Sequence, residues 1–216
     1  MSERPRWLVA AVAGLVVLAA CGGDDGDAVD GSEPAGDTVA GELTGVVREP
    51  PPSVDGQTVP SLSSPGDEHV FRAEEGGLQV VYFGYTNCPD VCPTTMADLT
   101  VALRKLPDGM AERVETVMVT VDPERDLDVL PDYVTSFVDD AEAAGTLDDD
   151  VLAAAAEPFG VVYDVRETDD GTIEVDHSPF LYVVDDRGML VLSWQFGASS
   201  DDMAADIEAL LDRSSA

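Results

Sequence analysis

Two of the three cysteines of the chain stand close together in the stretch VYFGYTNCPDVCPTTMADL, residues 81–99. Cys88 and Cys92 are four positions apart and follow an apolar run. Thiols at this spacing could form a structural disulfide, act as a redox pair, or supply two ligands to a metal ion. The elements that position the two cysteines help to separate these interpretations.

The residues around the pair predict a turn between a buried strand and a helix. LQVVYFGY, residues 78–85, has the continuous apolar character of a central strand, and Pro93 suits the first position of the following helix. Backbone N–H groups at a helix start stabilise a thiolate, so we expect the pKa values of both thiols to be lowered. A disulfide between Cys88 and Cys92 would close a very small loop and add little stability, which disfavours a purely structural disulfide.

His177, in EVDHSPFLYVV (residues 174–184), is a third candidate ligand. Two residues later, the Ser178–Pro179 bond could face the cysteine turn, where it could be cis. A single histidine is more often a surface or core residue than a ligand. Two thiolates and one imidazole together favour Cu(I), because structural zinc normally has four ligands. The only other histidine, His69 in the loop GDEHVF, is expected on the surface.

The remaining chain alternates strand and helix patterns. Helical patterns cover 93–106, 127–138, 148–160 and 199–213, and a second buried strand pattern covers 114–122. Two strand pairs with turns of the Asp-Asp-Gly and Asp-Arg-Gly type follow within 161–178 and 180–196. Residues 42–56 are irregular and broken by prolines. This order predicts an α/β, thioredoxin-like fold with a central mixed β-sheet flanked by helices.

Three segments together resemble the Sco/SenC family of copper chaperones for cytochrome c oxidase assembly: YFGYTNCPDVCPTTMADL, VTVDPERD and VDHSPFLYVVDDRG. The resemblance runs from about Leu43 to the end of the chain. It implies a thioredoxin-like domain over 43–216 that binds one copper ion, as Cu(I) or Cu(II). Carried over by position, Cys88, Cys92 and His177 would be the metal ligands, and Cys88 and Cys92 would also form a redox disulfide.

The Asp-Pro-Glu-Arg-Asp turn after the second buried strand allows two roles for Asp122. This carboxylate could approach the metal as a weak additional oxygen ligand, particularly for Cu(II). We favour a structural role, in which Arg125 pairs with carboxylates in the turn. Among the aromatic residues near the cysteines, Tyr82 and Phe83 are assigned to the core, and Tyr85 could shield the rim of the site.

Two classes of function fit these residues. In the first, a metallochaperone carries copper to the binuclear copper A centre of cytochrome c oxidase subunit II, as the family resemblance implies, or to another copper client. In the second, Cys88 or Cys92 attacks a disulfide of a partner, so the protein would be a thiol-disulfide oxidoreductase. His177 discriminates between the two, because copper binding needs it and disulfide exchange does not. A peroxiredoxin-like peroxidase fits poorly, because it would use a lone peroxidatic cysteine.

The N-terminal residues predict export and a lipid anchor. Arg4 and Arg6 precede an apolar run over 7–20 that is too short to span a bilayer comfortably and suits a signal peptide over 1–20. The run ends in LAAC, which looks like a bacterial lipobox with Cys21 as the lipidated residue; a cleaved secretory signal with an incidental cysteine is the alternative. Residues 21–42 are predicted to be a flexible acidic linker. The expected location is therefore the extracytoplasmic face of the cell membrane.

The charge balance excludes some partners. The formal net charge is -33, with 44 acidic residues against 11 basic ones. Nucleic acid and anionic lipid surfaces are poor partners for such a chain, because little would neutralise their phosphates. The acidic surface suggests life in high salt, where screening relieves self-repulsion, or else simply an acid-biased proteome.

Overall fold

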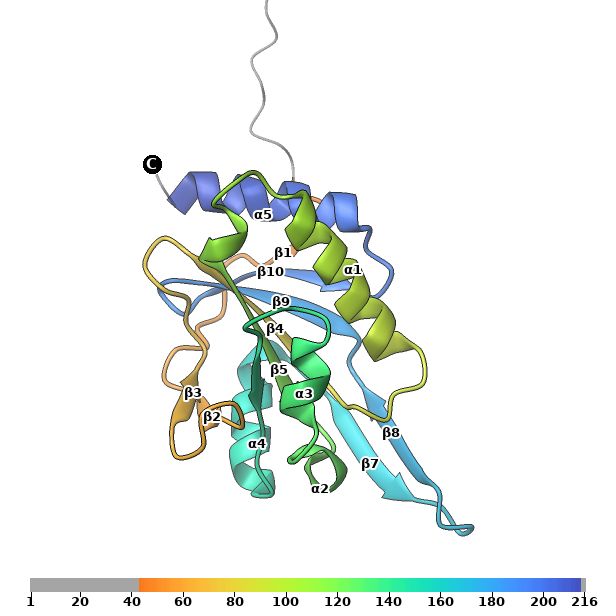
Figure 1. Ribbon diagram of the computed structural model, residues 1–216. Coiled ribbons are helices and arrows are strands. Elements are labelled where there is room, and N and C mark those ends of the chain that lie inside the picture. The colour runs from red at the N-terminus through yellow and green to blue at the C-terminus, as the bar shows by residue number, and fades with distance from the viewer. Residues whose placement is uncertain (1–42, 215–216) are drawn as a thin grey trace, which may run out of the picture. The chain divides into compact units, whose positions relative to one another are not determined.

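The computed structural model describes residues 43–214 (Figure 1). The predicted signal peptide, the lipidation site Cys21 and the predicted linker lie outside the described residues. Within 43–214, no helix is both long and apolar enough to cross a membrane. The helices are α1 (Val91–Lys105), α2 (Pro123–Asp126), α3 (Leu130–Thr135), α4 (Asp149–Ala156) and α5 (Ser200–Ser214), with short 3₁₀ turns at Ala111–Arg113 and Glu157–Phe159.

The strands build one central sheet and two small hairpins. They are β1 (Val46–Val47), β2 (Thr58–Pro60), β3 (Glu68–Val70), β4 (Leu78–Gly84), β5 (Val114–Thr120), β6 (Glu142–Ala144), β7 (Tyr163–Glu167), β8 (Ile173–His177), β9 (Phe180–Asp185) and β10 (Leu190–Gln195). The central sheet has the order β1-β10-β9-β4-β5-β6. β4, β5 and β6 run parallel, while β9 is antiparallel to β4 and β10 is antiparallel to β9. The predicted mixed sheet is confirmed.

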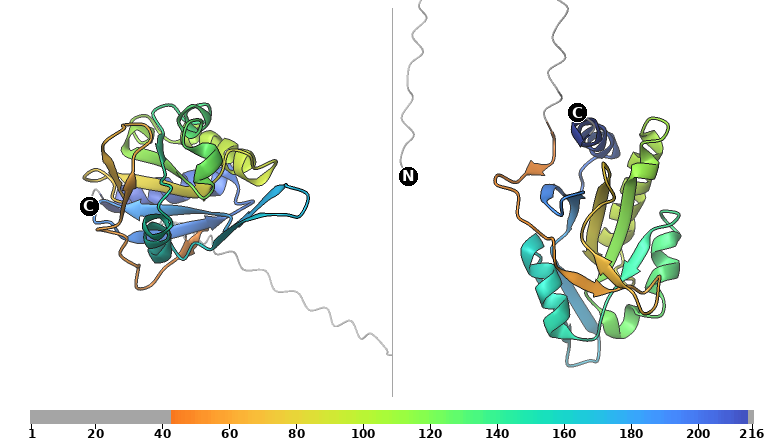
Figure 2. Two further views of the ribbon diagram at one scale, coloured as in Figure 1. Left: turned by 90° about the horizontal axis from the view of Figure 1, so that it is seen from below. Right: turned by 90° about the vertical axis from the view of Figure 1, so that its left-hand side faces the viewer.

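Helices cover both faces of this sheet (Figure 2). α1, α3 and α5 pack on one face around the side chains of Tyr82 and Met118, and α4 and the β2–β3 hairpin pack on the other face around Phe83 and Val119. Side chains of successive strand residues point to opposite faces, so the continuous apolar run of β4 serves both cores. β4 therefore lies at the centre of the molecule, and the chain leaves its carboxyl end directly toward the two cysteines.

The helix that carries Cys92 begins earlier than predicted. α1 starts at Val91, so Pro93 is its third residue rather than its first. Cys92 consequently lies within the first turn, and it is buried with Met96 and Leu99 on the side that faces the sheet. The helix ends at Lys105, because Leu106 is extended ahead of Pro107.

Several short elements depart from the predicted pattern. The helix expected over 127–138 is confined to α3, and a short α2 forms within the Asp-Pro-Glu-Arg-Asp turn. β6 was not predicted, because three residues of the type Glu-Ala-Ala carry no strand signal of their own. β1 to β3 also form in the segment before residue 78, part of which was expected to be irregular. The predicted helix over 148–160 is confirmed in α4, where the Asp148 carboxylate accepts hydrogen bonds from the first-turn N–H groups of Asp150 and Val151.

The prediction that His69 lies on the surface is wrong. His69 is on β3 and is buried, and its Nδ1 lies 2.9 Å from the Glu142 carboxylate on β6. The ring also packs edge-on against Phe71. The segment that was expected to be a loop is therefore a strand of the β2–β3 hairpin. His69 is buried because this hairpin packs against the edge of the central sheet.

Candidate metal and redox site

Three residues from separate elements meet at the carboxyl end of β4. Cys88 lies in the loop after β4, Cys92 in the first turn of α1, and His177 is the last residue of β8. The ligand atoms of the three residues all lie within 4.8 Å of one another. The Cys92 Sγ atom is 3.5 Å from the His177 Nε2 atom. The structure thus brings together all three side chains that the sequence singled out, and Asp122 is not part of the group.

The two cysteines are free thiols in different surroundings. Cys92 is buried, whereas Cys88 is half-buried, and the Cys88 sulfur accepts a hydrogen bond of 3.2 Å from the backbone N–H of Cys92. This bond comes from the first turn of α1, as expected for a sulfur at a helix start. Burial nevertheless raises the pKa of the Cys92 thiol to about 12, with a further contribution from its hydrogen bond to Cys88. The prediction of a lowered pKa is therefore wrong for Cys92, because desolvation outweighs the helix terminus.

His177 presents one ring nitrogen to the cysteines. Its Nδ1 lies 3.1 Å from the backbone carbonyl oxygen of Ser178. A carbonyl oxygen can only accept, so this contact places the proton on Nδ1 and leaves the Nε2 lone pair directed at Cys92. Burial lowers the pKa of His177, which favours the neutral imidazole that binds metals. The cis peptide bond considered at Pro179 is absent, since the only cis bond within 43–214 precedes Pro50.

Two tyrosines enclose the imidazole. The rings of Tyr82 and Tyr85 lie edge-on to His177, with centroid distances of 5.9 and 5.8 Å. Tyr85 is only half-buried, so it stands at the rim of the site as expected, and Phe83 is a core residue as expected. Tyr82 is buried in the core, as predicted, but its contact with His177 was not foreseen. Strand alternation could have placed Tyr82 near Cys92, because Tyr82 lies with Val80 on the face of β4 that α1 covers, but it could not have indicated His177.

The Asp-Pro-Glu-Arg-Asp turn forms hydrogen bonds that hold the loop before Cys88 in place. Asp122 is buried and pairs with Arg125, in agreement with the structural role that we favoured. Asp126 is fully buried and accepts hydrogen bonds from the backbone N–H and the hydroxyl of Thr86, at 3.0 and 2.5 Å. It also accepts one from the Thr120 hydroxyl at 2.7 Å. Asp126 thereby fixes the loop two residues before Cys88, a positioning role that the sequence analysis missed.

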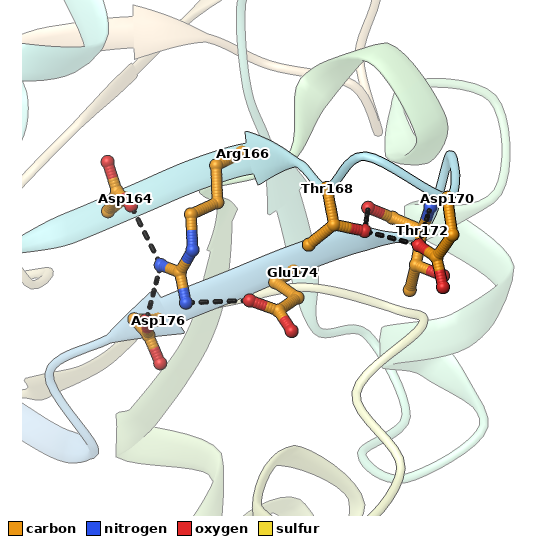
Figure 3. Close-up of polar contacts among 7 residues, drawn as sticks. All are labelled: Asp164, Arg166, Thr168, Asp170, Thr172, Glu174 and Asp176. Atoms are coloured by element: carbon orange, nitrogen blue, oxygen red, sulfur yellow. Dashed lines mark hydrogen bonds and ion pairs between the residues drawn. The ribbon is translucent and has the colours of Figure 1, made fainter.

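A hairpin that projects from the body of the domain carries His177 (Figure 1). Arg166 on β7 lies at its centre and pairs with Asp164, Glu174 and Asp176 at 2.9, 2.8 and 2.7 Å (Figure 3). These ion pairs are exposed, so each contributes little to stability, but together they connect β7 to β8. Asp176, the residue before His177, belongs to this cluster, so the base of the hairpin is held next to the cysteines.

Comparison with known proteins agrees with this geometry. The family model described as SCO1/SenC matches residues 64–212. The chain belongs to the SCO1/SenC family. Its relatives include a SCO2-like protein of Rickettsia prowazekii, 30% identical over 139 residues that cover 62% of this chain and 67% of the relative.

Solved structures of family members share the fold. The apo Sco1 protein of Thermus thermophilus has a TM-score of 0.66 and 32% identity, covering 78% of this chain and 97% of that one. ScoI of Bradyrhizobium japonicum, solved with copper bound, has a TM-score of 0.61 and 28% identity, covering 71% of this chain and 97% of that one. The predicted thioredoxin-like, mixed α/β domain is therefore that of the SCO1/SenC family.

Proposed function

We propose that this protein is a copper chaperone that binds one copper ion through Cys88, Cys92 and His177. The observation that carries the proposal is the convergence of two sulfur atoms and one imidazole nitrogen within 4.8 Å. Two soft thiolates and one imidazole suit Cu(I). Structural zinc normally has four protein ligands, and this group supplies three. The copper-bound family structure from Bradyrhizobium japonicum supports the choice of metal.

The arrangement of the three ligands suits a copper ion that is transferred to a partner protein. Cys88 and Tyr85 are half-buried, so a partner could reach the metal from this side and replace one ligand at a time. Because Cys92 is a neutral thiol when no metal is bound, loading copper releases its proton, and protonation assists release. His177 stays neutral to lower pH than an ordinary histidine, so its Nε2 remains available over a broad range.

The family and the sequence suggest a client and a location for the protein. We propose the copper A centre of cytochrome c oxidase subunit II as the client, with another copper enzyme as the alternative. Lipidation of Cys21 would hold the domain at the extracytoplasmic face of the cell membrane. Deletion of the gene should lower the copper A content of the oxidase, and added copper should restore it. Unchanged oxidase copper would identify a different client.

A copper titration of the reduced protein tests the proposed ligands. Cu(I) should bind at one equivalent, and Cys88→Ser, Cys92→Ser and His177→Ala should each weaken binding by about tenfold or more. Asp169→Asn is the matched control, because it changes an exposed residue in the turn of the same hairpin without removing a ligand. The proposal fails if His177→Ala retains the affinity and the spectrum of the unchanged protein.

A second candidate function is disulfide reduction in a partner. It is favoured by the half-buried Cys88 thiol beside the buried Cys92 thiol. The Cys88 thiolate would attack a partner disulfide and release one partner thiolate, forming a mixed disulfide. Cys92 would then attack Cys88, release the second partner thiol and leave a Cys88–Cys92 disulfide. The partner gains the two electrons that the cysteines lose. Exchange that survives His177→Ala while copper binding is lost would show that the site can perform both reactions.

A further inference from the structure

A groove of about 700 Å³ opens away from the metal site. The later turns of α1, the start of β5 and the connection between α3 and β6 form its walls, with Leu103 and Phe137 among the lining residues. Leu103 follows Cys92 by eleven positions on α1, which places it about 16 Å farther along the helix axis. The groove is therefore a separate feature from the cysteine and histidine group.

The groove runs along an edge of the central sheet. It is lined by four consecutive strand residues, 114–117, whose side chains alternate between the two faces of the sheet. A surface that reaches all four must include the edge of the strand, where backbone N–H and C=O groups lie. β4 pairs with β5 from Val114 onward, but β6 pairs with β5 only from Val117 onward. In the part of the chain that the structure describes, residues 114–116 thus have no strand partner on the groove side.

A buried hydroxyl in the lining of the groove has no hydrogen-bond partner within the described residues. Thr116 is 4% exposed and lines the groove, and its Oγ1 makes no hydrogen bond within the described residues. Buried hydroxyl groups in proteins almost always have a hydrogen-bond partner, because leaving one unsatisfied is costly. The free strand edge and the unpaired hydroxyl together indicate that this groove receives a polar chain with hydrogen-bonding groups.

The charges of the residues that line the groove indicate the charge of the segment that it would bind. Apolar side chains of Leu103, Phe137 and Val138 form part of the wall, and five of the lining residues are acidic against the single basic residue Arg104: Glu112, Glu115, Asp139, Asp140 and Glu142. Glu115 and Glu142 already make hydrogen bonds to Gln79 and His69. Asp139 and Asp140 are exposed and form no ion pair within 43–214, so they are available to a basic ligand.

We propose that this groove binds an extended, basic segment of a partner protein, which adds to the free edge of β5 in line with β6. Strand addition of this kind gains affinity from main-chain hydrogen bonds and specificity from alternate side chains. The chain's own residues 22–42 are unsuitable occupants, because they carry acidic residues and no basic one. A second copy of a chain with a net charge of -33 is disfavoured for the same reason. The surface would hold a partner independently of the metal site.

A peptide of alternating basic and apolar residues tests the proposal. The probe is fluorescein-labelled Lys-Val-Arg-Val-Lys-Val, added to the full protein at about 0.15 M salt and followed by anisotropy. We expect saturable binding that falls about tenfold when alternate peptide nitrogens of the probe are methylated, because methylation removes main-chain donors without changing charge. Amide hydrogen exchange should slow within residues 114–116 when the probe is bound.

Variants of the protein separate strand addition from general attraction of charges. Asp139→Asn with Asp140→Asn should weaken binding about tenfold, and Thr116→Val should weaken it about threefold. The matched control, Asp169→Asn with Asp212→Asn, removes the same charge from exposed positions outside the groove and should change binding less than twofold. Copper binding should be unaffected in all of them. Equal binding of the methylated probe, equal weakening by the control, or no binding at all would overturn the proposal.

Discussion

At the scale of single residues, the two cysteines differ more than their shared motif suggests. Cys88 lies in a loop and is half-buried, whereas Cys92 is buried in the first turn of α1 with a pKa raised to about 12. A helix start alone would lower both pKa values, but the first turn of α1 packs against the core, and desolvation dominates there. The pair therefore consists of one thiol on a half-buried residue and one thiol on a fully buried residue.

This asymmetry predicts the order of alkylation. In the reduced, metal-free protein at about pH 8, iodoacetamide should modify Cys88 about tenfold or more faster than Cys92, because the reaction needs an accessible thiolate. Mass spectrometry of timed digests measures both rates. In urea the two rates should become similar, which serves as the control. Faster modification of Cys92 in the folded protein would contradict the assigned burial.

Asp126 predicts an effect on the site without any loss of a ligand. In Asp126→Asn, one of the two acceptor oxygens becomes an NH2 donor and the buried charge is lost, so the Thr86 hydroxyl must reverse its hydrogen bond or lose it. We expect a loss of about 1–3 kcal/mol in the free energy of unfolding, measured in urea, together with weaker copper binding. The exposed Asp128→Asn is the matched control and should leave both unchanged. A destabilised variant with full copper affinity would limit Asp126 to a purely structural role.

At the scale of elements, the site depends on contacts between segments that are distant in sequence. Long apolar runs and regular periodicity predicted β4, β5, α1, α4, α5 and both late hairpins. The proximity of His177 to Cys92 could not come from spacing, because the two residues are 85 positions apart and β5, β6 and the helices α2, α3 and α4 lie between them. Only the resemblance to a family supplied that contact in advance.

The shortest elements were missed for a physical reason. β6 and the β2–β3 hairpin have few residues each, so their pairing energy comes from partners elsewhere in the chain rather than from local propensity. The same holds for His69, which is buried because the hairpin docks on β6. Local sequence gives no sign of that docking.

The contact between His69 and Glu142 predicts a dependence of stability on pH. The hydrogen bond from His69 lowers the pKa of Glu142 below its ordinary value. A carboxyl group with a lowered folded pKa stabilises the fold above its unfolded pKa of about 4.3, and this contribution is lost as the pH falls through the folded pKa. The free energy of unfolding should therefore fall more steeply for the unchanged protein than for Glu142→Gln as the pH falls from about 5 through the folded pKa of Glu142. Parallel curves would show that the pair does not couple to folding.

At the scale of the whole molecule, charge is the dominant property. The 44 acidic residues face only 11 basic ones, and several of the basic residues are already engaged in ion pairs, as Arg166 is with three carboxylates. Most acidic groups therefore repel one another across the surface in dilute buffer. A folded core built on both faces of the central sheet must overcome this repulsion.

Self-repulsion predicts stabilisation by salt. The melting temperature should rise between about 0.1 M and 1 M sodium chloride, because the Debye length shortens from about 10 Å to about 3 Å. Calorimetric or circular dichroism melts measure this shift, and sodium sulfate at equal ionic strength separates screening from salting-out. A flat response would show that the acidic surface is tolerated without screening.

The most direct test of the proposed site is copper K-edge X-ray absorption of the protein loaded with one equivalent of Cu(I). The convergence of the Cys88, Cys92 and His177 ligand atoms predicts two sulfur neighbours and one imidazole nitrogen, with the nitrogen lost in His177→Ala and retained in His69→Gln. A shell of sulfur alone in the unchanged protein, or an imidazole signal that survives His177→Ala, would contradict the account.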